Sequence, residues 1–238
     1  MDLSKKTILV TGANRGIGAA IVRELLTRGV GKIYAASRDT AKLPDFGDAR
    51  VVKLALDITD SAQIQRAAAQ AKDVQVLINN AGIATHGNVV QSDSAALAAD
   101  MQVNYFGTLS MLHAFAPVLE KNGGGVIANV ISVVGLASIP AIGGYSASKA
   151  ALFSATQAAR AELAPKQIKV VGIFPGPIDT DMAREFPMEK ASAATAAKAI
   201  ADGLAAGVED IFPDPMSQQV SQLWASNPKA LEKQFAGM

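Results

Sequence analysis

Tyr145 and Lys149 stand four residues apart in the segment YSASK, and Ser132 precedes the tyrosine by thirteen residues. Positions i and i+4 lie on the same face of a helix, so the phenol and the ammonium would project in one direction. A neighbouring cation favours the phenolate and lowers the pKa of a tyrosine from its usual value of about 10. The pair is therefore suited to proton exchange near neutral pH, although a solvated helix face could carry the same two residues.

A glycine-rich turn comes early in the chain, where residues 11–18 read TGANRGIG. It directly follows an expected strand and opens an expected helix, and glycines there let the backbone approach a pyrophosphate closely. The first turn of such a helix offers free N–H groups to phosphates. The spacing is G-x-x-x-G-x-G, and no Gly-Lys-Ser/Thr ends the segment as a P-loop would require. We predict a dinucleotide site, with a turn of purely structural use as the alternative.

The end of the second expected strand bears on the choice between NAD and NADP. An acidic residue about 20 positions after the glycine turn would bind the ribose 2′-hydroxyl of NAD. Ser37 occupies this place, Arg38 follows it, and Arg15 lies inside the turn. Guanidinium groups bind phosphate strongly, so we predict NADP(H) in preference to NAD(H). Asp39 keeps NAD(H) open as the alternative.

The composition limits the class of protein. The 238 residues are 50% hydrophobic and 18% charged, which suits one domain with a sizeable core. A net charge of +1 gives no case for binding nucleic acid or an acidic membrane. Cysteine is absent, and His86 and His113 are too isolated to suggest a metal site. The N-terminus does not resemble a signal peptide and no apolar run reaches about 18 residues, so we expect a cytoplasmic protein without a membrane span.

Short β-branched runs alternate with longer helical patterns along the whole chain. This order predicts an α/β fold whose mainly parallel sheet carries helices on both faces, with no domain boundary between residues 1 and 238. We expect strands at about 7–10, 32–36, 50–56, 74–78, 125–131 and 169–174, with a short one at 208–212. We expect helices at about 17–28, from 60 onward, and at 94–119, 145–163 and 191–206, with helix formers again at 218–224 and 228–235. The helix at 94–119 is expected to be irregular near Gly107.

Several separated motifs, taken in order, resemble the short-chain dehydrogenase/reductase family over about residues 6–182. Besides the glycine turn and the Ser-Tyr-Lys set, these are LDITD around Asp57, NNAG at 79–82, VNYFG around Asn104 and PGPIDT at 175–180. The resemblance implies a single-domain, doubly wound Rossmann fold with a seven-stranded sheet. One departure is the C-terminal region GVEDIFPDPMSQQ, where many members of the family carry an Asp-Gly-Gly-like turn.

The resemblance also implies roles for individual residues. The catalytic set would be Asn104, Ser132, Tyr145 and Lys149. Tyr145 would supply a proton, Ser132 would bind the reacting oxygen, and Lys149 would lower the pKa of the tyrosine and bind the nicotinamide ribose. The residues implied to bind the cofactor, besides Tyr145 and Lys149, are Gly12, Asn14, Arg15, Gly16, Ile17, Gly18, Ser37, Arg38, Asp57, Ile58, Asn80, Ala81, Gly82, Pro175, Gly176, Ile178 and Thr180.

We therefore expect an NADPH-dependent enzyme that reversibly reduces an aldehyde or ketone to an alcohol, without a metal. An NADP(H)-binding regulatory or sensor protein with weak or no turnover is the alternative, and a dehydratase or epimerase is a third. We expect the substrate region from about residue 183 to 238, and a homodimer or homotetramer. Residues expected near an apolar substrate are Val134, Leu136, Ile139, Ile142, Pro177, Met182 and Phe186, with Arg184 as a candidate for binding an acid.

Overall fold

The computed structural model describes residues 1–184 and 187–238, and its centre is a seven-stranded sheet. The strand order is β3-β2-β1-β4-β5-β6-β9, and every pair of neighbours is parallel. This doubly wound order reverses between β1 and β4, where such sheets open a crevice at the carboxyl ends of the strands. The strands are β1 Thr7–Thr11, β2 Lys32–Ser37, β3 Val51–Ala55, β4 Val76–Asn79, β5 Gly125–Val130, β6 Ile168–Ile173 and β9 Asp210–Ile211.

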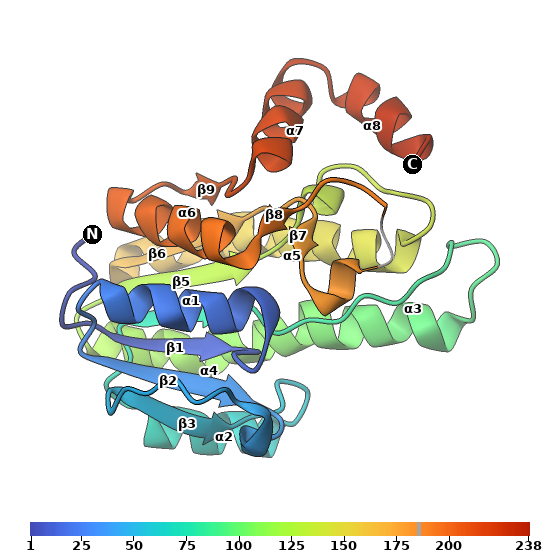
Figure 1. Cartoon of the computed structure of the whole chain (residues 1–238). Helices are drawn as coiled ribbons and strands as arrows, with labels where there is room; N and C mark the ends of the chain where they lie inside the picture. Colours follow the sequence, from blue (N-terminus) through green and yellow to red (C-terminus); the bar gives the residue numbers. More distant parts are fainter. Residues whose placement is uncertain (185–186) are drawn as a thin grey trace.

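Helices cover both faces of the sheet (Figure 1). One face packs against α1 Gly16–Thr27 and α6 Ala193–Ala206, and the other packs against α2 Ser61–Gln70, α4 Thr108–Lys121 and α5 Gly143–Leu163. The α/β fold predicted from the alternating pattern is thus confirmed, and so is the doubly wound, seven-stranded sheet that the family resemblance implied. In Figure 1, α7 Pro215–Ser226 and α8 Pro228–Ala236 project from the rest of the chain at the C-terminal end.

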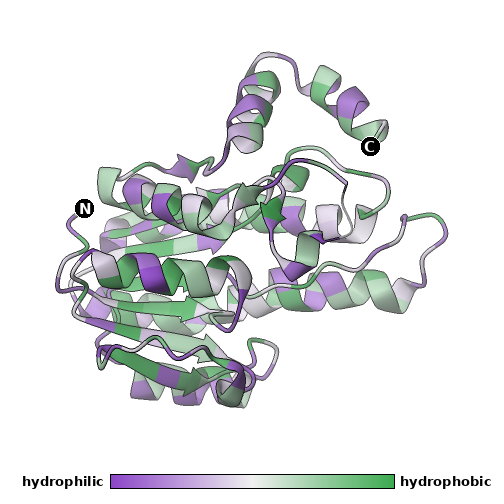
Figure 2. Cartoon of the chain, in the orientation of Figure 1, coloured by the Kyte–Doolittle hydropathy of each residue, from purple (hydrophilic) through white to green (hydrophobic). Residues whose placement is uncertain are grey.

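Alternate residues of the strands supply two separate cores. In β1, Ile8 and Val10 face the layer of α1 and α6, whereas Leu9 faces the opposite layer, because successive strand residues point to opposite faces. Both faces are buried, so the central strands are apolar almost throughout (Figure 2). A third cluster contains Phe174, Val220 and Phe235 and joins β6 to α7 and α8.

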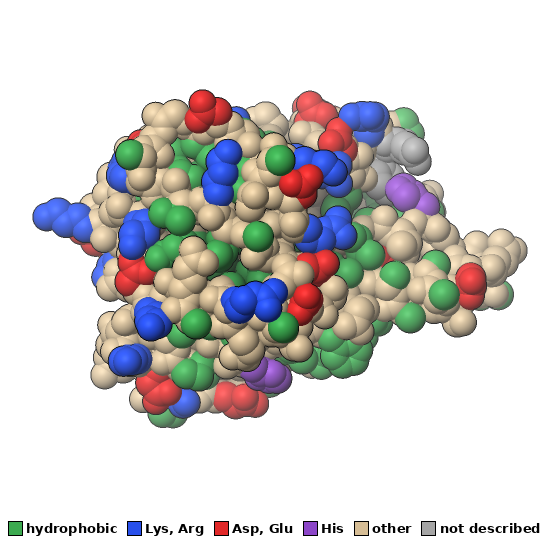
Figure 3. Space-filling view, turned by 90° about the horizontal axis from the view of Figure 1, so that it is seen from below, with side chains coloured by type: hydrophobic (Ala, Val, Ile, Leu, Met, Phe, Trp, Pro, Cys, Tyr) green, Lys and Arg blue, Asp and Glu red, His purple; other side chains and the backbone are tan. Residues whose placement is uncertain are grey.

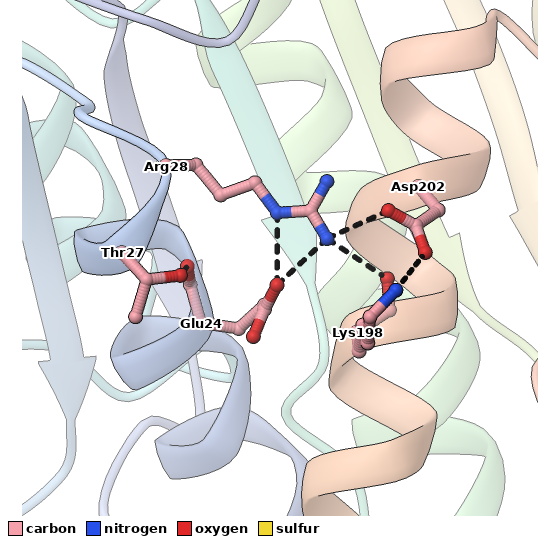
Figure 4. Close-up of polar contacts among 5 residues, drawn as sticks. All are labelled: Glu24, Thr27, Arg28, Lys198 and Asp202. Atoms are coloured by element: carbon pink, nitrogen blue, oxygen red, sulfur yellow. Dashed lines mark hydrogen bonds and ion pairs between the residues drawn. The ribbon is translucent and has the colours of Figure 1, made fainter.

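A polar contact joins the ends of α1 and α6 (Figure 4). The Arg28 guanidinium lies 2.7 Å from both Glu24 on its own helix and Asp202 on α6, and Lys198 pairs with Asp202 at 2.8 Å. The Arg28 side chain is 23% exposed. Partly exposed pairs of this kind contribute roughly 0.2–1 kcal/mol each, so apolar packing remains the main force between the two helices.

The expected helix at 94–119 is interrupted in the structure. It consists of α3 Ser94–Asp100, a π-helical segment at Met101–Gly107 and then α4. Inside the π-helical segment, Asn104 bonds the loop after β4 and Ser148 of α5. A π-helical turn re-aims side chains within a continuous helix and is frequent at functional sites. The irregularity predicted near Gly107 is thus present, but side-chain periodicity did not indicate that it is a π-helical turn reaching back to Met101.

Smaller differences concern element ends. Residues 191–192 do not begin the predicted helix, because β8 Ala191–Ser192 pairs with β7 Ile178–Asp179 and the Ser192 hydroxyl then caps α6. The last strand of the main sheet spans Asp210–Ile211 rather than 208–212.

A buried amide ladder ties the middle of the sheet to α5. Asn79 on β4 donates to Asn129 on β5 at 2.9 Å, and Asn129 donates to the Thr156 hydroxyl at 3.0 Å. All three side chains are buried, where unmade hydrogen bonds are costly. The ladder therefore fixes α5, the helix that carries Tyr145 and Lys149, against β4 and β5.

Within the described residues, no helix has the length and apolarity needed to cross a bilayer. Basic and acidic side chains are interspersed over the face seen in Figure 3, without a continuous patch of one sign.

Candidate active site

A cavity of about 770 Å³ lies at the carboxyl edge of the sheet, where the strand order reverses. It extends from the glycine turn after β1, past the ends of β2 and β3, to Ser132, Tyr145 and Lys149. The segment at 175–183 and Met216 of α7 close its other side. A space of this size suits a dinucleotide together with part of a small substrate.

The glycine turn presents the open end of a helix to this cavity. Gly12 and Gly16 have backbone φ values of +64° and +53°, which residues other than glycine rarely adopt. Both glycines line the cavity. The N-terminus of α1 has no capping side chain and no acidic residue in its first turn. Its first N–H groups and its dipole are thus available to an anion, as a phosphate site requires.

Gly18 has a different task from the other two glycines. It does not line the cavity, and a Cβ at this position would lie 2.3 Å from the Gly12 oxygen and 2.5 Å from Asn80 Nδ2. Glycine is needed there because α1 packs directly on the turn. The close packing of α1 on the turn, and not contact with a ligand in the cavity, is the reason that Gly18 must be a glycine.

The turn is fastened to the end of β4. Asn80 Nδ2 donates to the backbone oxygens of Thr11 and Gly12 at 2.9 and 3.2 Å. The Thr11 hydroxyl accepts from the backbone N–H groups of Asn80 and Ala81, each at 3.0 Å. These bonds hold the end of β4 against the glycine turn and keep β1 and β4 together at the crevice.

Positive side chains gather where β2 ends. Arg15, Arg38 and Lys42 all line the cavity, and so do Ser37 and Asp39. The Asp39 carboxylate accepts from the Ala41 N–H at 3.0 Å and lies 3.8 Å from Lys42, so it caps a short 3-10 helix. Arg15 reaches across the cavity mouth to Asp181 at 3.2 Å.

Tyr145 and Lys149 lie on one face of α5, as the spacing predicted. Lys149 is buried, donates to the Val130 oxygen at 2.8 Å, and has its Nζ 5.6 Å from the centroid of the Tyr145 ring. Ser132 caps a short 3-10 helix after β5 and donates to the Pro175 oxygen at 3.3 Å. The three side chains share one wall of the cavity.

The predicted effect of Lys149 on the tyrosine is wrong for this structure. The Tyr145 side chain is half-buried in the cavity wall, and this desolvation raises its pKa to about 12; the hydrogen bond to Ser132 lowers the pKa by less, and the negative charge of Asp100 raises it further. Burial also lowers the pKa of Lys149 to about 8, and Asp100 opposes that shift. The ammonium is directed to Val130 and not to the phenol oxygen, so desolvation outweighs the cation.

Asn104 lies behind the cavity wall. It is fully buried, accepts from the Ile83 N–H at 2.9 Å, and donates to the Ile83 oxygen at 2.8 Å and to Ser148 at 2.9 Å. A Cβ on Gly82 would lie 2.9 Å from Asn104 Oδ1 and 3.6 Å from Lys149 Nζ. Asn104 therefore reaches the neighbourhood of Lys149 without lining the cavity.

The C-terminal region is fastened to the segment after β6. Asp214 is buried, accepts from the Gly176 N–H at 2.8 Å and caps α7 by accepting from Ser217. A Cβ on Gly176 would lie 2.7 Å from Asp214 Oδ1. The divergent sequence FPDPMS thus positions the loop at 175–180, which the sequence alone did not indicate.

Most of the residues predicted from the sequence meet at this cavity. Of the predicted site residues, only Gly18 and Asn104 do not line it. Among the predicted substrate residues, Leu136 and Arg184 do not line it, and Arg184 pairs with Asp181. Phe186 lies outside the described residues. Lining residues that were not singled out as contacts include Lys42, Ile83, Val103, Asp181, Met188 and Met216. Lys42 could have been predicted as a phosphate contact, because it is a cation four residues after Arg38 in the sequence.

No group of His, Cys, Asp or Glu side chains in the described ranges could hold a metal ion.

Comparison with known proteins agrees with the fold and the motifs. Residues 6–191 match the short chain dehydrogenase family, so the chain belongs to that family and is an oxidoreductase. An uncharacterized oxidoreductase of Staphylococcus saprophyticus is 32% identical over 193 residues, covering 76% of this chain and 82% of the relative.

Two solved structures extend the comparison. A short chain dehydrogenase of Burkholderia cenocepacia in complex with NADP is 42% identical, with a TM-score of 0.94 and coverage of 99% of both chains. A short chain dehydrogenase/reductase of Burkholderia phymatum in complex with NAD is 24% identical, with a TM-score of 0.86 and coverage of 97% of this chain and 96% of the other. The second likeness concerns the fold alone.

Proposed function

We propose that the chain is an NADPH-dependent reductase of apolar aldehydes or ketones, working reversibly. The observation that carries this proposal is one cavity with an uncapped helix end at one side and Ser132, Tyr145 and Lys149 at the other. A phosphate-binding helix end and a proton-donating phenol are the two elements that reduction of a carbonyl by a bound dinucleotide needs.

The residues around the glycine turn fit a dinucleotide. The backbone at Gly12, Gly16 and Ile17 would hold the pyrophosphate, and the lining residues Asp57 and Ile58 would contact the adenosine. The PGPIDT segment would hold the nicotinamide carboxamide. The similar Burkholderia cenocepacia dehydrogenase in complex with NADP supports the same cofactor here.

The charges at the end of β2 support NADP(H) over NAD(H). Arg38 and Lys42 offer two cations to a 2′-phosphate, and Arg15, which pairs with Asp181 at 3.2 Å, adds a third positive group at the cavity mouth. The one acid at this place, Asp39, already accepts from Ala41 and lies beside Lys42. Ser37 supplies no carboxylate for a 2′-hydroxyl, so the local charge favours the phosphorylated ribose.

The reduced nicotinamide, when bound, supplies the hydride that reaches the carbonyl carbon. Tyr145 donates its proton to the substrate oxygen as negative charge develops there, and the Ser132 hydroxyl donates a hydrogen bond to the same oxygen. Burial raises the pKa of the free phenol, so the proposal requires the bound cofactor and the Ser132 hydroxyl to make Tyr145 a stronger acid. Lys149 would bind the nicotinamide ribose, and Asn104 would hold the loop and the solvent path through which Lys149 regains a proton.

The substrate side of the cavity is apolar. Val134, Ile139, Ile142, Pro177 and Met182 line it, with Met188 and Met216 beside them. Methionine adapts to irregular apolar shapes, so the proposed substrate is an uncharged, hydrophobic carbonyl compound. We further propose that residues 1–238 form one catalytic domain in a cytoplasmic homodimer or homotetramer. Its substrate-binding region at about 183–238 would act together with the lining residues named above.

The test is the loss of NADPH absorbance with a panel of neutral and carboxylated aldehydes and ketones. Turnover of the neutral, apolar members and its loss in Tyr145→Phe are expected. Tight NADPH binding without turnover of any carbonyl would instead favour a regulatory or sensor protein.

A further inference from the structure

Asp100 is a fully buried carboxylic acid that lies behind the cavity wall. It is the last residue of α3, directly before the π-helical segment, and its exposure is 0%. Its Oδ1 accepts from the Thr85 N–H at 3.1 Å and its Oδ2 accepts from the Thr85 hydroxyl. A buried carboxyl group is costly unless donors or positive potential compensate it, and Thr85 supplies a donor to each of its two oxygens.

Positive potential comes from the beginning of α5. A Cβ placed on Gly144 would lie 3.2 Å from Asp100 Oδ2, so the carboxylate packs against the first turn of this helix. The N-terminus of α5 carries no capping side chain and no acid of its own in the first turn. The helix dipole favours an anion at this position. Asp100 therefore places a negative charge at the start of the helix that carries Tyr145 and Lys149.

Asp100 also acts on the cavity wall together with Asn104. The two residues are one helical turn apart, and both hold the segment that follows β4: Asn104 bonds Ile83, and Asp100 bonds Thr85. Ile83 lines the cavity. Asn104 further reaches Ser148, so this pair links α3, the wall and α5.

The charge of Asp100 affects the pKa values of both Tyr145 and Lys149. It raises the pKa of Lys149, against the larger lowering by burial, and it raises the pKa of Tyr145 in addition to burial. In the described part of the chain no direct ion pair joins Asp100 to Lys149, so the effect acts through the low-dielectric interior. The other ionisable side chains on the elements around Asp100 are His86, Asp93 and Tyr105, with Arg160 and Glu162 toward the far end of α5.

We propose that Asp100 is a positioning residue of the active site, whose buried negative charge holds Lys149 as an ammonium ion and whose bonds to Thr85 fix the adjoining wall. The inference rests on the role proposed above for Lys149. It assigns Asp100 an electrostatic task that Asn104, an uncharged neighbour on the same helix face, cannot perform.

The test follows the titration of Lys149 by NMR in the full chain, with lysine labelled by ¹³C at the ε carbon. The Lys149 signal is assigned by its loss in Lys149→Met. In the unaltered protein its midpoint is expected near pH 8. In Asp100→Asn, which keeps the size and an acceptor for Thr85, the midpoint is expected to fall by about half a pH unit or more. Asp45→Asn removes an exposed carboxylate far from α5 and is expected to leave the midpoint unchanged.

An unchanged Lys149 midpoint in a folded Asp100→Asn protein would overturn the proposal. Asp100→Ser provides a second uncharged variant, and near-ultraviolet circular dichroism checks that each variant is folded. If neither variant folds, Asp100 serves the fold alone and the proposal fails. Because the measurement needs no substrate, a shifted midpoint in a protein that reduces no carbonyl would retain this inference and reject the proposed reaction.

Discussion

Lys149 Nζ lies over the Tyr145 ring, 5.6 Å from its centroid, and donates to the Val130 oxygen at 2.8 Å. The ammonium is therefore held by the carboxyl end of β5. Among the described residues, Lys149 makes no hydrogen bond to the Tyr145 phenol oxygen. Burial then dominates both pKa values, raising that of Tyr145 and lowering that of Lys149. The phenol is thus protonated at neutral pH, and its activation as an acid is expected to depend on the bound cofactor.

Replacing Tyr145 by Phe should remove most of the turnover and leave NADPH affinity nearly unchanged. A positioned general acid contributes about 10²–10⁴-fold to the rate, and the phenol oxygen is the only atom lost. Single-turnover kinetics and NADPH fluorescence titration measure the two effects. Tyr105→Phe makes the same change on the π-helical segment, away from the cavity lining, and should keep turnover. Undiminished turnover in Tyr145→Phe would remove this residue from the mechanism.

Replacing Arg38 by Ala should weaken NADPH and leave NADH almost unaffected. A hydrogen bond to a charged group contributes about 1.5–3 kcal/mol, so the Kd for NADPH should rise about 10-fold to 150-fold. Isothermal titration calorimetry with both cofactors provides the measurement. Arg66→Ala removes an exposed arginine from α2 and should change neither Kd. Equal weakening of NADH and NADPH would show that Arg38 does not read the 2′-phosphate.

The burial of Lys149 should make stability rise with pH in the alkaline range. Its pKa is about 8 in the folded chain against 10.5 for an unperturbed lysine, so the unfolded state binds more protons between these values. The free energy of unfolding should therefore rise from pH 8 toward pH 10.5, relative to Lys149→Met, by about 1–3 kcal/mol. Below pH 8 both states are protonated and the difference should be constant. Urea unfolding at several pH values measures it, and a difference independent of pH would contradict the depressed pKa.

Replacing Asp214 by Ala should affect both stability and cofactor binding. The variant loses the cap of α7 and the acceptor for the Gly176 N–H, and loss of a cap costs about 0.5–2 kcal/mol. Because Gly176 lines the cavity, the Kd for NADP⁺ should rise as well. Asp93→Ala removes the cap of α3 and should lower stability without changing this Kd. Equal Kd values in the two variants would show that Asp214 does not position the loop.

The fold and most of the cavity lining could be predicted because they depend on local patterns. Apolar runs define the parallel strands, and the glycine turn, the NNAG segment and the YSASK helix lie at strand ends that must meet at one edge. Features that depend on three-dimensional packing could not be predicted. Gly107 indicated an irregular helix but not a π-helical turn around Asn104, and Met216 reaches the cavity from the last part of the chain. The pKa of Tyr145 depends on burial, which sequence spacing does not report.

The central claim is that one dinucleotide connects the open end of α1 with Tyr145, and a crystal structure of the NADP⁺ complex tests it most directly. The pyrophosphate is predicted on the N–H groups around Gly16 and Ile17, with the 2′-phosphate beside Arg38. The nicotinamide C4 should face open space next to Tyr145. A substrate placed there would have its carbonyl carbon about 3–3.5 Å from C4 and its carbonyl oxygen within hydrogen-bond reach of the phenol. A nicotinamide ring remote from Tyr145, or phosphates bound away from the glycine turn, would contradict the account.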